Sequence, residues 1–324
     1  MSTMTYSDAG KTALAECMRA DPTIWAVGED LGRGGVFGQY MGLEEEFGPE
    51  RIVSTPISEA AIMGSAVGGA LTGTRPVVEL RFADFALCAV DEMVNQAAKA
   101  RYMFGGQAKV PLVIRQPSGM WRSSAAQHSQ SLEAWYAHIP GLVVLMPATP
   151  VDNYGLLKAA IECDDPVVYL EHKDLWSLEG EVPGGHTVEI GKAHVVQEGR
   201  DVTIVTWSKT CHVAAEAAGT LAASGTSVEL IDLRSLWPWD RECVLASAAK
   251  TGRLLVAHEA VRDGGFGAEV AATAAEEIAG LKLARLGAPR IPIPYAPPLE
   301  DTVRVTAETI VGAVERLTQG VRGR

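Results

Sequence analysis

Short runs of branched apolar residues alternate with longer alanine-rich stretches along the first half of the chain. The short runs predict strands buried on both faces, at 23–28, 77–80, 110–115, 142–146 and 167–170. The longer stretches predict helices at 6–20, 59–72, 90–102 and 154–162. Such alternation indicates a mostly parallel sheet with helices on both faces.

The pattern lapses at about 174–190, where Glu, Gly and Pro predominate, and we expect a linker or an irregular connection there. It resumes with predicted strands at 202–206, 227–230 and 253–257, and with predicted helices at 213–223, 241–249, 267–279 and 306–318. A chain of 324 residues commonly forms two domains. We therefore predict two doubly wound α/β domains, one at 1–185 and one at 191–324.

Composition and charge narrow the class of protein. The chain is 47% hydrophobic and 21% charged, which is typical of a globular protein. Its net charge of −12 disfavours nonspecific binding to nucleic acid or to an anionic membrane. The apolar stretch 54–74 contains a proline, a glutamate and four glycines, so a buried helix is expected there in place of a membrane span.

The cysteines are five in number, lie far apart and form no C-x-x-C pair, which disfavours a zinc knuckle or a disulfide framework. They favour a reducing compartment. Residues 1–11 are polar and contain no signal-peptide core, so the cytoplasm is the expected location.

Glu59 is the only charged residue between Ser54 and Thr74, and it begins a predicted helix of small and apolar residues with Ser58 as a candidate N-cap. One interpretation is ordinary helix-dipole chemistry, because acidic residues are common in a first turn. The other is a desolvated carboxylate with a raised pKa, prepared to hold a proton. Gly64 and Gly68 make this helix thin, so a flat cofactor or a partner helix would fit against it.

His128 lies in the polar cluster Gln127–Ser131, which follows a predicted strand. Open α/β sheets bind ligands at the carboxyl ends of strands, so His128 is a candidate acid, base or hydrogen-bond donor, with a plain loop histidine as the alternative. Other catalytic motifs are missing from the sequence: it contains no Walker loop, no G-x-S-x-G and no H-E-x-x-H. The glycine-rich stretch 32–38 does not match G-x-G-x-x-G, so a nicotinamide-binding module is poorly supported.

Several motifs together resemble one family, the beta subunits of the decarboxylating E1 component of 2-oxo acid dehydrogenase complexes. This group includes pyruvate, branched-chain 2-oxo acid and acetoin dehydrogenases. The resemblance extends from about Thr5 to Leu317. The motifs that carry it are Ser54–Ile62, Phe82–Phe85, Asn95–Lys99, Gln127–Ser131 and Pro292–Pro298.

The resemblance implies a transketolase-like fold with a pyrimidine-binding domain followed by a transketolase C-terminal domain. It implies thiamine diphosphate as cofactor, bound between this chain and an alpha subunit in an α2β2 assembly. In such families the alpha subunit carries the Gly-Asp-Gly…Asn sequence that binds Mg²⁺ and the diphosphate. This chain contains no Gly-Asp-Gly, which independently predicts a partner.

The resemblance also implies roles for single residues. Glu59 matches the glutamate that hydrogen-bonds N1′ of the cofactor's aminopyrimidine, and Phe85 matches the aromatic residue that stacks on that ring. Ile57 and Arg81 are expected to line the same pocket. His128 matches a histidine that faces the substrate and assists transfer of the acyl group to a lipoyl arm.

A potassium site is implied as well. Its ligands would be backbone oxygens of Leu112, Ala160 and Cys163 together with Asp165. Oxygen ligands suit a hard cation, although an Asp-Asp-Pro sequence is equally typical of a turn.

Two features depart from the family pattern. Arg81 stands where many relatives have glutamine, and the loop 118–123 contains Trp121 and Arg122 in place of a more glycine-rich sequence. Either arginine suits a substrate carboxylate or phosphate, which leads to the hypothesis of a substrate more acidic or more elaborate than pyruvate. The alternative is that Arg81 pairs with Asp84 or Glu79.

The sequence thus predicts an enzyme: the beta subunit of a thiamine-diphosphate-dependent 2-oxo acid or acetoin dehydrogenase. With its alpha subunit it would decarboxylate the donor and pass the acyl group to a lipoyl-bearing acyltransferase. Residues 126–135 favour a pyruvate or acetoin type over a branched-chain type. The alternatives are a two-subunit transketolase or carboligase that needs no lipoyl partner, and a non-catalytic assembly subunit.

Overall fold

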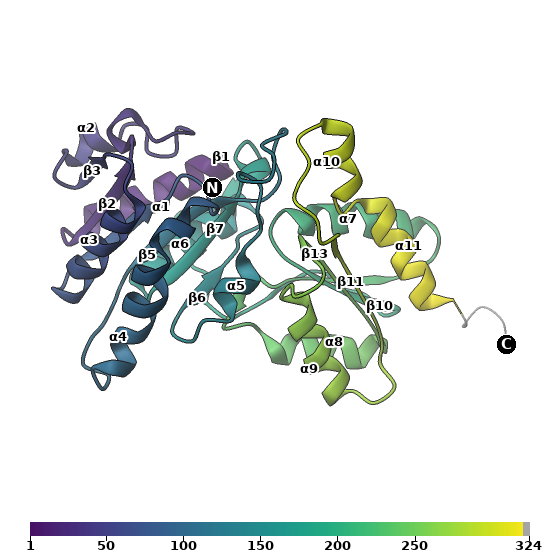
Figure 1. The fold of residues 1–324 in the computed structure, drawn as a ribbon. Coiled ribbons are helices and arrows are strands. Elements are labelled where there is room, and N and C mark those ends of the chain that lie inside the picture. The colour runs from purple at the N-terminus through teal and green to yellow at the C-terminus, as the bar shows by residue number, and fades with distance from the viewer. Residues whose placement is uncertain (320–324) are drawn as a thin grey trace. The chain divides into compact units, whose positions relative to one another are not determined.

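The computed structural model describes residues 1–319, which divide into two compact units (Figure 1). The first unit comprises 1–118 and 135–190, and the second comprises 119–134 and, among the described residues, 191–319. The sequence placed 119–134 in the first domain, but contacts group this segment with the second unit. No helix within residues 1–319 is long and apolar enough to cross a membrane.

The first unit is built on a parallel sheet with strand order β6-β7-β5-β4-β2-β3. The strands are β2 (Ile24–Glu29), β3 (Ile52–Thr55), β4 (Arg75–Glu79), β5 (Val113–Ser118), β6 (Val143–Leu145) and β7 (Val167–His172). β5 begins later than the predicted 110–115, since Pro111 has no N–H to donate to a neighbouring strand. The predicted parallel α/β architecture is confirmed.

The helices predicted in the first unit are present, and the one predicted at 90–102 differs in form. They are α1 (Tyr6–Ala20), α2 (Leu43–Phe47), α3 (Glu59–Leu71), α4 (Ala98–Met103), α5 (Glu133–Ala137, which spans the boundary) and α6 (Pro150–Glu162), with 3₁₀ turns η1 (Leu31–Arg33), η2 (Phe85–Ala89) and η4 (Lys173–Leu175). The predicted helix 90–102 is instead a π-helical turn, η3 (Glu92–Ala97), followed by α4. Asp91 accepts hydrogen bonds from the side chains of Asn95 and Gln96, four and five residues on, which suits a widened turn.

The segment expected to be a linker is part of the first unit. Residues Glu179–Val182 form β8, which pairs antiparallel with β1 (Ser2–Thr5). Val182 and Val188 are buried in the apolar core that α1 and α6 form against the sheet. The alternating Glu and Gly residues hid β8, because its pairing partner lies almost 180 positions away in sequence.

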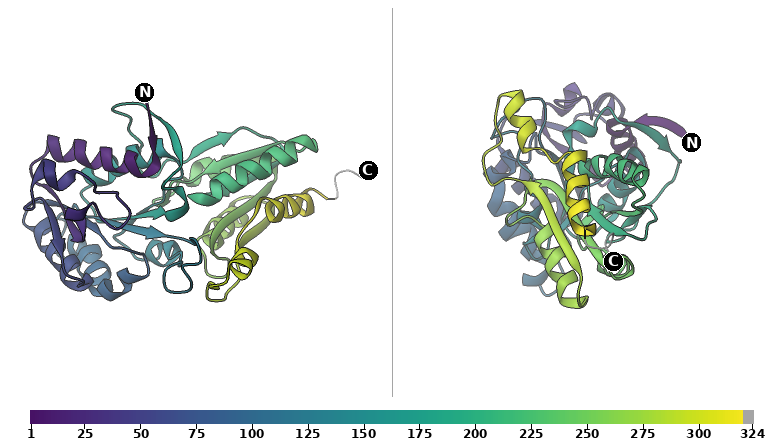
Figure 2. Two further views of the ribbon diagram at one scale, coloured as in Figure 1. Left: turned by 90° about the horizontal axis from the view of Figure 1, so that it is seen from above. Right: turned by 90° about the vertical axis from the view of Figure 1, so that its right-hand side faces the viewer.

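The second unit has a five-stranded sheet of order β14-β13-β10-β11-β9, parallel except for β9. Helices α7 and α11 pack on one face around a shared core, side by side in Figure 2, and α8 and α9 cover the other. The elements are β9 (His194–Gln197), β10 (Val202–Thr206), β11 (Val228–Asp232), β12 (Ser235–Trp237), β13 (Arg253–Val261), β14 (Lys282–Ala288), α7 (Lys209–Ala223), α8 (Arg241–Thr251), α9 (Gly267–Glu277), α10 (Pro297–Val303) and α11 (Ala307–Thr318).

A charged network is enclosed in the first unit beside the sheet. Arg115 on β5 lies 2.8 Å from Glu171 on β7 and 3.8 Å from Glu79 on β4, and all three side chains are at most 3% exposed. Glu79 also accepts hydrogen bonds from Tyr40 at 3.1 Å and Gln39 at 3.2 Å. Burial raises the pKa of the Glu79 carboxyl to about 7, an effect that Arg115 partly opposes.

Glu79 gives the fold a pH dependence that can be tested. Its pKa is higher in the folded than in the unfolded chain, so proton uptake favours folding as the pH falls from about 7 toward the ordinary value of 4.5. We expect Glu79→Gln to remove a stability gain on the order of 3 kcal/mol over this window, measured by chemical denaturation at pH 8 and pH 5. Glu50→Gln, at an exposed position, is the control; equal pH slopes in both variants would contradict the assignment.

Candidate active site

Three neighbouring parallel strands of the first unit end at one edge of the sheet. Glu29 ends β2 opposite Thr55, which ends β3, and Gly28 pairs with Glu79 at the end of β4. The residues that follow these strands carry the predicted side chains Ile57, Glu59, Arg81 and Phe85. Carboxyl ends of parallel strands are where open α/β sheets bind ligands.

Glu59 is the first residue of α3 and is half-buried. Ser58 occupies the N-cap position, as predicted, and its side chain makes no capping hydrogen bond. The negative charge of Glu59 acts on a second carboxyl at this edge, because it contributes to the raised pKa of Glu29. Two carboxyl groups thus share the site.

Glu29 is the site residue that the sequence reasoning missed. Its side chain is 7% exposed and pairs with Arg81, whose Nη1 lies 3.3 Å from Glu29 Oε2. Burial is the main cause that raises the Glu29 pKa; Arg81 opposes it, and the like charges of Glu59 and Asp30 add to it. A charged residue that ends an otherwise buried strand is the sequence signal for this position.

Arg81 pairs with neither of the residues proposed as its alternative partners. Besides Glu29, its nearest carboxylate is that of Asp30, at 3.9 Å. Glu79 turns to the other side, toward the enclosed Arg115. Glu79 lies opposite Gly28 in the sheet, and the next residue on β2, Glu29, points to the opposite face, which accounts for the separation between Glu79 and Glu29.

Phe85 is held by a chain of aromatic contacts. Its ring packs edge-on against Phe82 at 5.3 Å, and Phe82 in turn packs edge-on against Phe37 at 5.8 Å. Phe37 lies 4.1 Å from the ring of Trp176. These rings fix the place of Phe85 beside the edge that carries Glu59, as stacking on a flat heterocycle requires.

The edge has groups that suit an aminopyrimidine ring. Thr55 Oγ1 and Arg81 Nε are buried and have no hydrogen-bond partner within residues 1–319. Ile57 exposes 74% of its surface, an unusual share for isoleucine. Unsatisfied polar atoms beside an uncovered apolar side chain fit a heterocycle with ring nitrogens and an apolar face, so the residues present are compatible with the pyrimidine of thiamine diphosphate.

Metal ligands are a different matter. Residues 1–319 contain no group of three or more His, Cys, Asp or Glu side chains arranged to hold a metal ion. At the predicted potassium site, the oxygen of Cys163 accepts a hydrogen bond from Arg75 at 3.1 Å, and Asp165 pairs with Arg101. Two guanidinium groups therefore bring positive charge to this place, and potassium at Leu112, Ala160, Cys163 and Asp165 stays a prediction.

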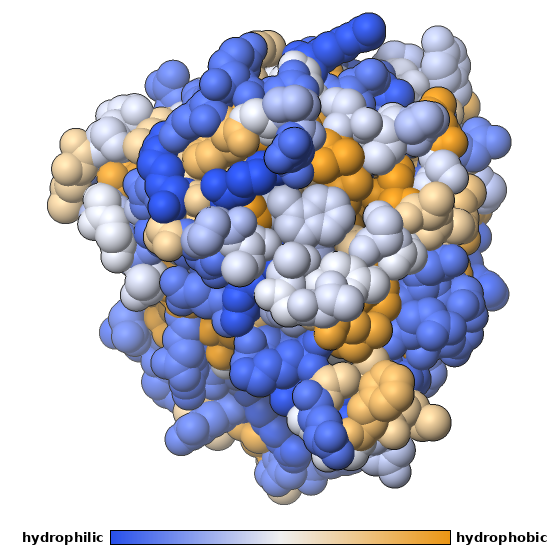
Figure 3. All heavy atoms as spheres, turned by 90° about the vertical axis from the view of Figure 1, so that its left-hand side faces the viewer, coloured by the Kyte–Doolittle hydropathy of each residue, from blue (hydrophilic) through white to orange (hydrophobic). Residues whose placement is uncertain are grey.

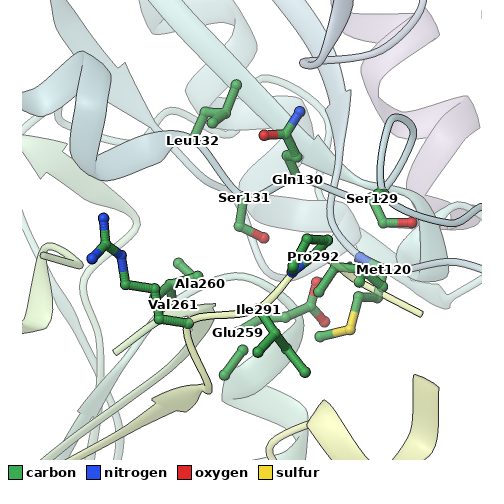
Figure 4. A pocket seen from close by; sticks show the side chains of 14 residues that line it. Met120, Ser129, Gln130, Ser131, Leu132, Glu259, Ala260, Val261, Ile291 and Pro292 are labelled. Atoms are coloured by element: carbon green, nitrogen blue, oxygen red, sulfur yellow. Dashed lines mark hydrogen bonds between the residues drawn. The ribbon is translucent and has the colours of Figure 1, made fainter. Parts of the chain in front are cut away.

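His128 belongs to the second unit, in the segment 119–134. It is half-buried, and its backbone N–H donates a hydrogen bond to Ala125 O at 3.4 Å. This segment borders a cavity of about 460 Å³ that Ser129, Gln130, Ser131 and Leu132 line on one side (Figure 4). Trp121 and Arg122, noted as departures, lie in the same loop with the guanidinium 5.2 Å from the ring centroid.

The sequence and the fold were compared with those of known proteins. Residues 2–177 match the family described as the transketolase pyrimidine-binding domain, and residues 191–310 match the transketolase C-terminal domain. A solved structure titled "Split gene transketolase, inactive beta4 tetramer" superposes with a TM-score of 0.82 at 26% identity, covering 97% of this chain and 98% of that one. The fold and the site define a transketolase-like protein of the thiamine-diphosphate-dependent class.

Sequence relatives narrow the class further. The chain is 41% identical to 2-oxoisovalerate dehydrogenase subunit beta of Bacillus subtilis, over 98% of this chain and 100% of that one. It is 42% identical to the beta subunit of acetoin:2,6-dichlorophenolindophenol oxidoreductase of Cupriavidus necator, over 95% of each chain. It is 42% identical to the mitochondrial pyruvate dehydrogenase E1 component subunit beta-2 of Oryza sativa, over 97% of this chain and 86% of that one. The chain belongs to this family of dehydrogenase E1 beta subunits.

The close approach of β2 and β4 at the site generates a testable prediction. A Cβ added at Gly28 would lie 2.5 Å from the backbone oxygen of Glu79. We expect Gly28→Ala to separate the strands that carry Glu29 and Arg81 and to lower the free energy of unfolding by roughly 1–3 kcal/mol. Gly219→Ala on α7, where an added Cβ meets nothing within 4 Å, is the control. Equal unfolding midpoints for the two variants would refute the argument.

Proposed function

We propose that the chain is the beta subunit of a thiamine-diphosphate-dependent 2-oxo acid dehydrogenase of pyruvate type, or of an acetoin dehydrogenase. Together with an alpha subunit it decarboxylates the donor and passes the acyl group to a lipoyl-bearing acyltransferase. The observation that carries the proposal is that Glu59 and Phe85 follow strands β3 and β4, which flank β2, with the unsatisfied Thr55 Oγ1 at the end of β3, in a chain about 41% identical to such subunits. The relatives with different substrates match almost equally well, so identity does not choose among donors.

In this proposal the residues of the chain bind and orient the cofactor. When bound, thiamine diphosphate supplies the thiazolium carbon that serves as nucleophile and electron sink for decarboxylation. Glu59 shares or holds a proton at ring atom N1′, Phe85 stacks on the ring, and Ile57 excludes water from it. Burial raises the pKa of the neighbouring Glu29 carboxyl, so Glu29 retains a proton more readily than an exposed carboxyl does.

Several surfaces of the first unit support an alpha-subunit partner. Small residues on one face of α3 are exposed at helical spacing, namely Ala61, Gly64, Ser65 and Gly68. Tyr102, Met103 and Phe104 expose 86%, 72% and 59% of their surfaces at the end of α4. On the face drawn in Figure 3, hydrophobic residues reach the surface in several patches among hydrophilic ones. Thin helices and exposed apolar clusters are typical of subunit interfaces.

The partner completes the site in this proposal. The sequence contains no Gly-Asp-Gly, and residues 1–319 hold no acidic or histidine cluster for Mg²⁺, which the alpha subunit would bind in an α2β2 assembly. Potassium would be an additional structural ion.

The five cysteines are free thiols, in agreement with the proposed cytoplasmic location.

The split site can be tested by calorimetric binding of thiamine diphosphate and Mg²⁺ to this chain alone and to the chain assembled with its alpha subunit. We expect binding only in the assembly. Glu59→Gln should lower turnover by roughly 10²–10⁴-fold, as expected for a lost proton-transfer group, while Glu50→Gln on the exposed surface leaves it unchanged. Binding in neither sample would favour a non-catalytic assembly subunit. Turnover with an aldehyde acceptor and no lipoyl partner would favour a carboligase.

Arg81 provides a test of the donor. Its Nη1 holds Glu29, and its Nε has no partner within residues 1–319, so the guanidinium keeps a donor for an acidic group. We propose that the substrate is more acidic or more elaborate than pyruvate, and we expect Arg81→Gln to shift kcat/KM by about 10-fold or more toward 2-oxo acids that carry no second acidic group. Competition assays with paired donors measure the shift, and an unchanged preference counts against the proposal.

A further inference from the structure

The loop that carries His128 has an unfavourable backbone conformation. Its base is closed by a hydrogen bond from Gly119 N–H to Gln130 O at 3.3 Å. Within it, Arg122, Ser123 and Ala125 have φ angles of 45°, 59° and 59°, in the left-handed region that non-glycine residues rarely adopt. Such a conformation persists only where surrounding groups hold it in place.

Two glutamates from the C-terminal part of the chain hold the leading side of this loop. Glu259 Oε1, on β13, accepts the backbone N–H of Met120 at 2.6 Å. Glu300 Oε2, on α10, accepts the backbone N–H of Ser123 at 2.9 Å. Hydrogen bonds from N–H groups to carboxylates are stronger than those between neutral groups, so these two contacts fix the loop firmly.

Glu300 is itself held in place. Its side chain is 4% exposed, and Arg304, one turn further along, pairs with its other oxygen. Arg304 also lies 3.8 Å from Asp301, whose side chain is 76% exposed. A buried carboxylate with one oxygen on an arginine and the other on a backbone N–H is oriented from both sides.

Packing does not replace these contacts. The trailing side of the loop, Ser129 to Leu132, faces the cavity of about 460 Å³, with Glu259, Ala260 and Ile291 across it (Figure 4). Beyond the loop, Trp207 Nε1 donates to Glu133 at 3.3 Å. The segment around His128 is therefore held by Glu259 and Glu300 on its leading side and by the Trp207–Glu133 hydrogen bond beyond its end, and the residues next to it border a cavity.

We propose that Glu259 and Glu300 are positioning residues for His128. They keep the left-handed loop in the single conformation that presents the imidazole for acyl transfer. The inference rests on the proposed role of His128 toward a lipoyl arm and adds the two carboxylates that make this role possible. Neither glutamate is assigned a contact with substrate or cofactor.

The experiment uses the assembled alpha–beta enzyme with two acceptors, a lipoyl domain and a dye that takes electrons without lipoyl transfer. We expect Glu300→Ala and Glu259→Ala to lower lipoyl-dependent kcat by about 10-fold or more, with dye-dependent turnover retained within about 2-fold. Glu300→Gln keeps an acceptor oxygen for Ser123 N–H, so it should restore most of the lipoyl activity. Asp301→Ala, on the same helix and beside the same arginine, is the matched control and should be normal.

The outcomes distinguish failure of the positioning role from failure of the proposed role of His128. If His128→Ala leaves lipoyl transfer intact, the role of His128 fails, and the positioning role fails with it. If His128→Ala is defective while both glutamate variants are normal, only the positioning role is overturned. An equal loss with both acceptors, or an equal loss in Asp301→Ala, would show a general structural effect and overturn it as well. Retained dye turnover demonstrates that the variants fold.

Discussion

Parallel pairing of β2, β3 and β4 is the constraint on which the candidate site depends. In a parallel sheet every strand delivers its carboxyl end to the same edge, so residues separated by 20 to 50 positions meet there without any long-range side-chain recognition. Glu29, Thr55 and the segment after β4 converge in this way. The absence of a side chain at Gly28 lets β2 lie close to β4 at that point.

Desolvated carboxylates serve two purposes in this acidic chain. Glu79 and Glu171 surround Arg115 in an enclosed network where each charge has a partner, and Tyr40 and Gln39 donate further hydrogen bonds to Glu79. Glu29 and Glu59 lie at an open edge, where Arg81 offsets only part of the negative charge. The first arrangement contributes to the fold, and in the second the pKa of Glu29 is raised at the edge where the cofactor is proposed to bind.

The site in the first unit and the His128 loop in the second differ in how their backbone is held in place. The sheet edge is rigid, because hydrogen-bonded strands fix each side chain. The loop has no such ladder and depends on Glu259 and Glu300, which come from 139 and 177 positions further along the chain. Glu59, proposed to hold a proton, and His128, proposed to act in acyl transfer, therefore differ in how much the position of each depends on residues far away in the chain.

Local pattern predicted much of the secondary structure. The helix 6–20 and the strand 202–206 have the predicted bounds, because apolar periodicity and capping depend on near neighbours. Thr5, for example, caps α1 by accepting a hydrogen bond from Asp8 N–H. Short or polar strands such as β8, β9 and β14 were missed, because only their partners in the sheet make them strands. The helix predicted at 90–102 was interrupted by side-chain hydrogen bonds to Asp91 that hydrophobic periodicity does not report.

The sequence by itself determined the alternation of strands and helices, the solitary carboxylate at Glu59 and the motifs that place the chain in its family. These depend on residue types at short spacings. Only the tertiary structure decided that Arg81 pairs with Glu29, that residues 119–134 belong with the second unit, and that two distant glutamates hold the His128 loop. Such contacts join residues far apart in the chain, and the folded backbone alone brings them within hydrogen-bonding distance.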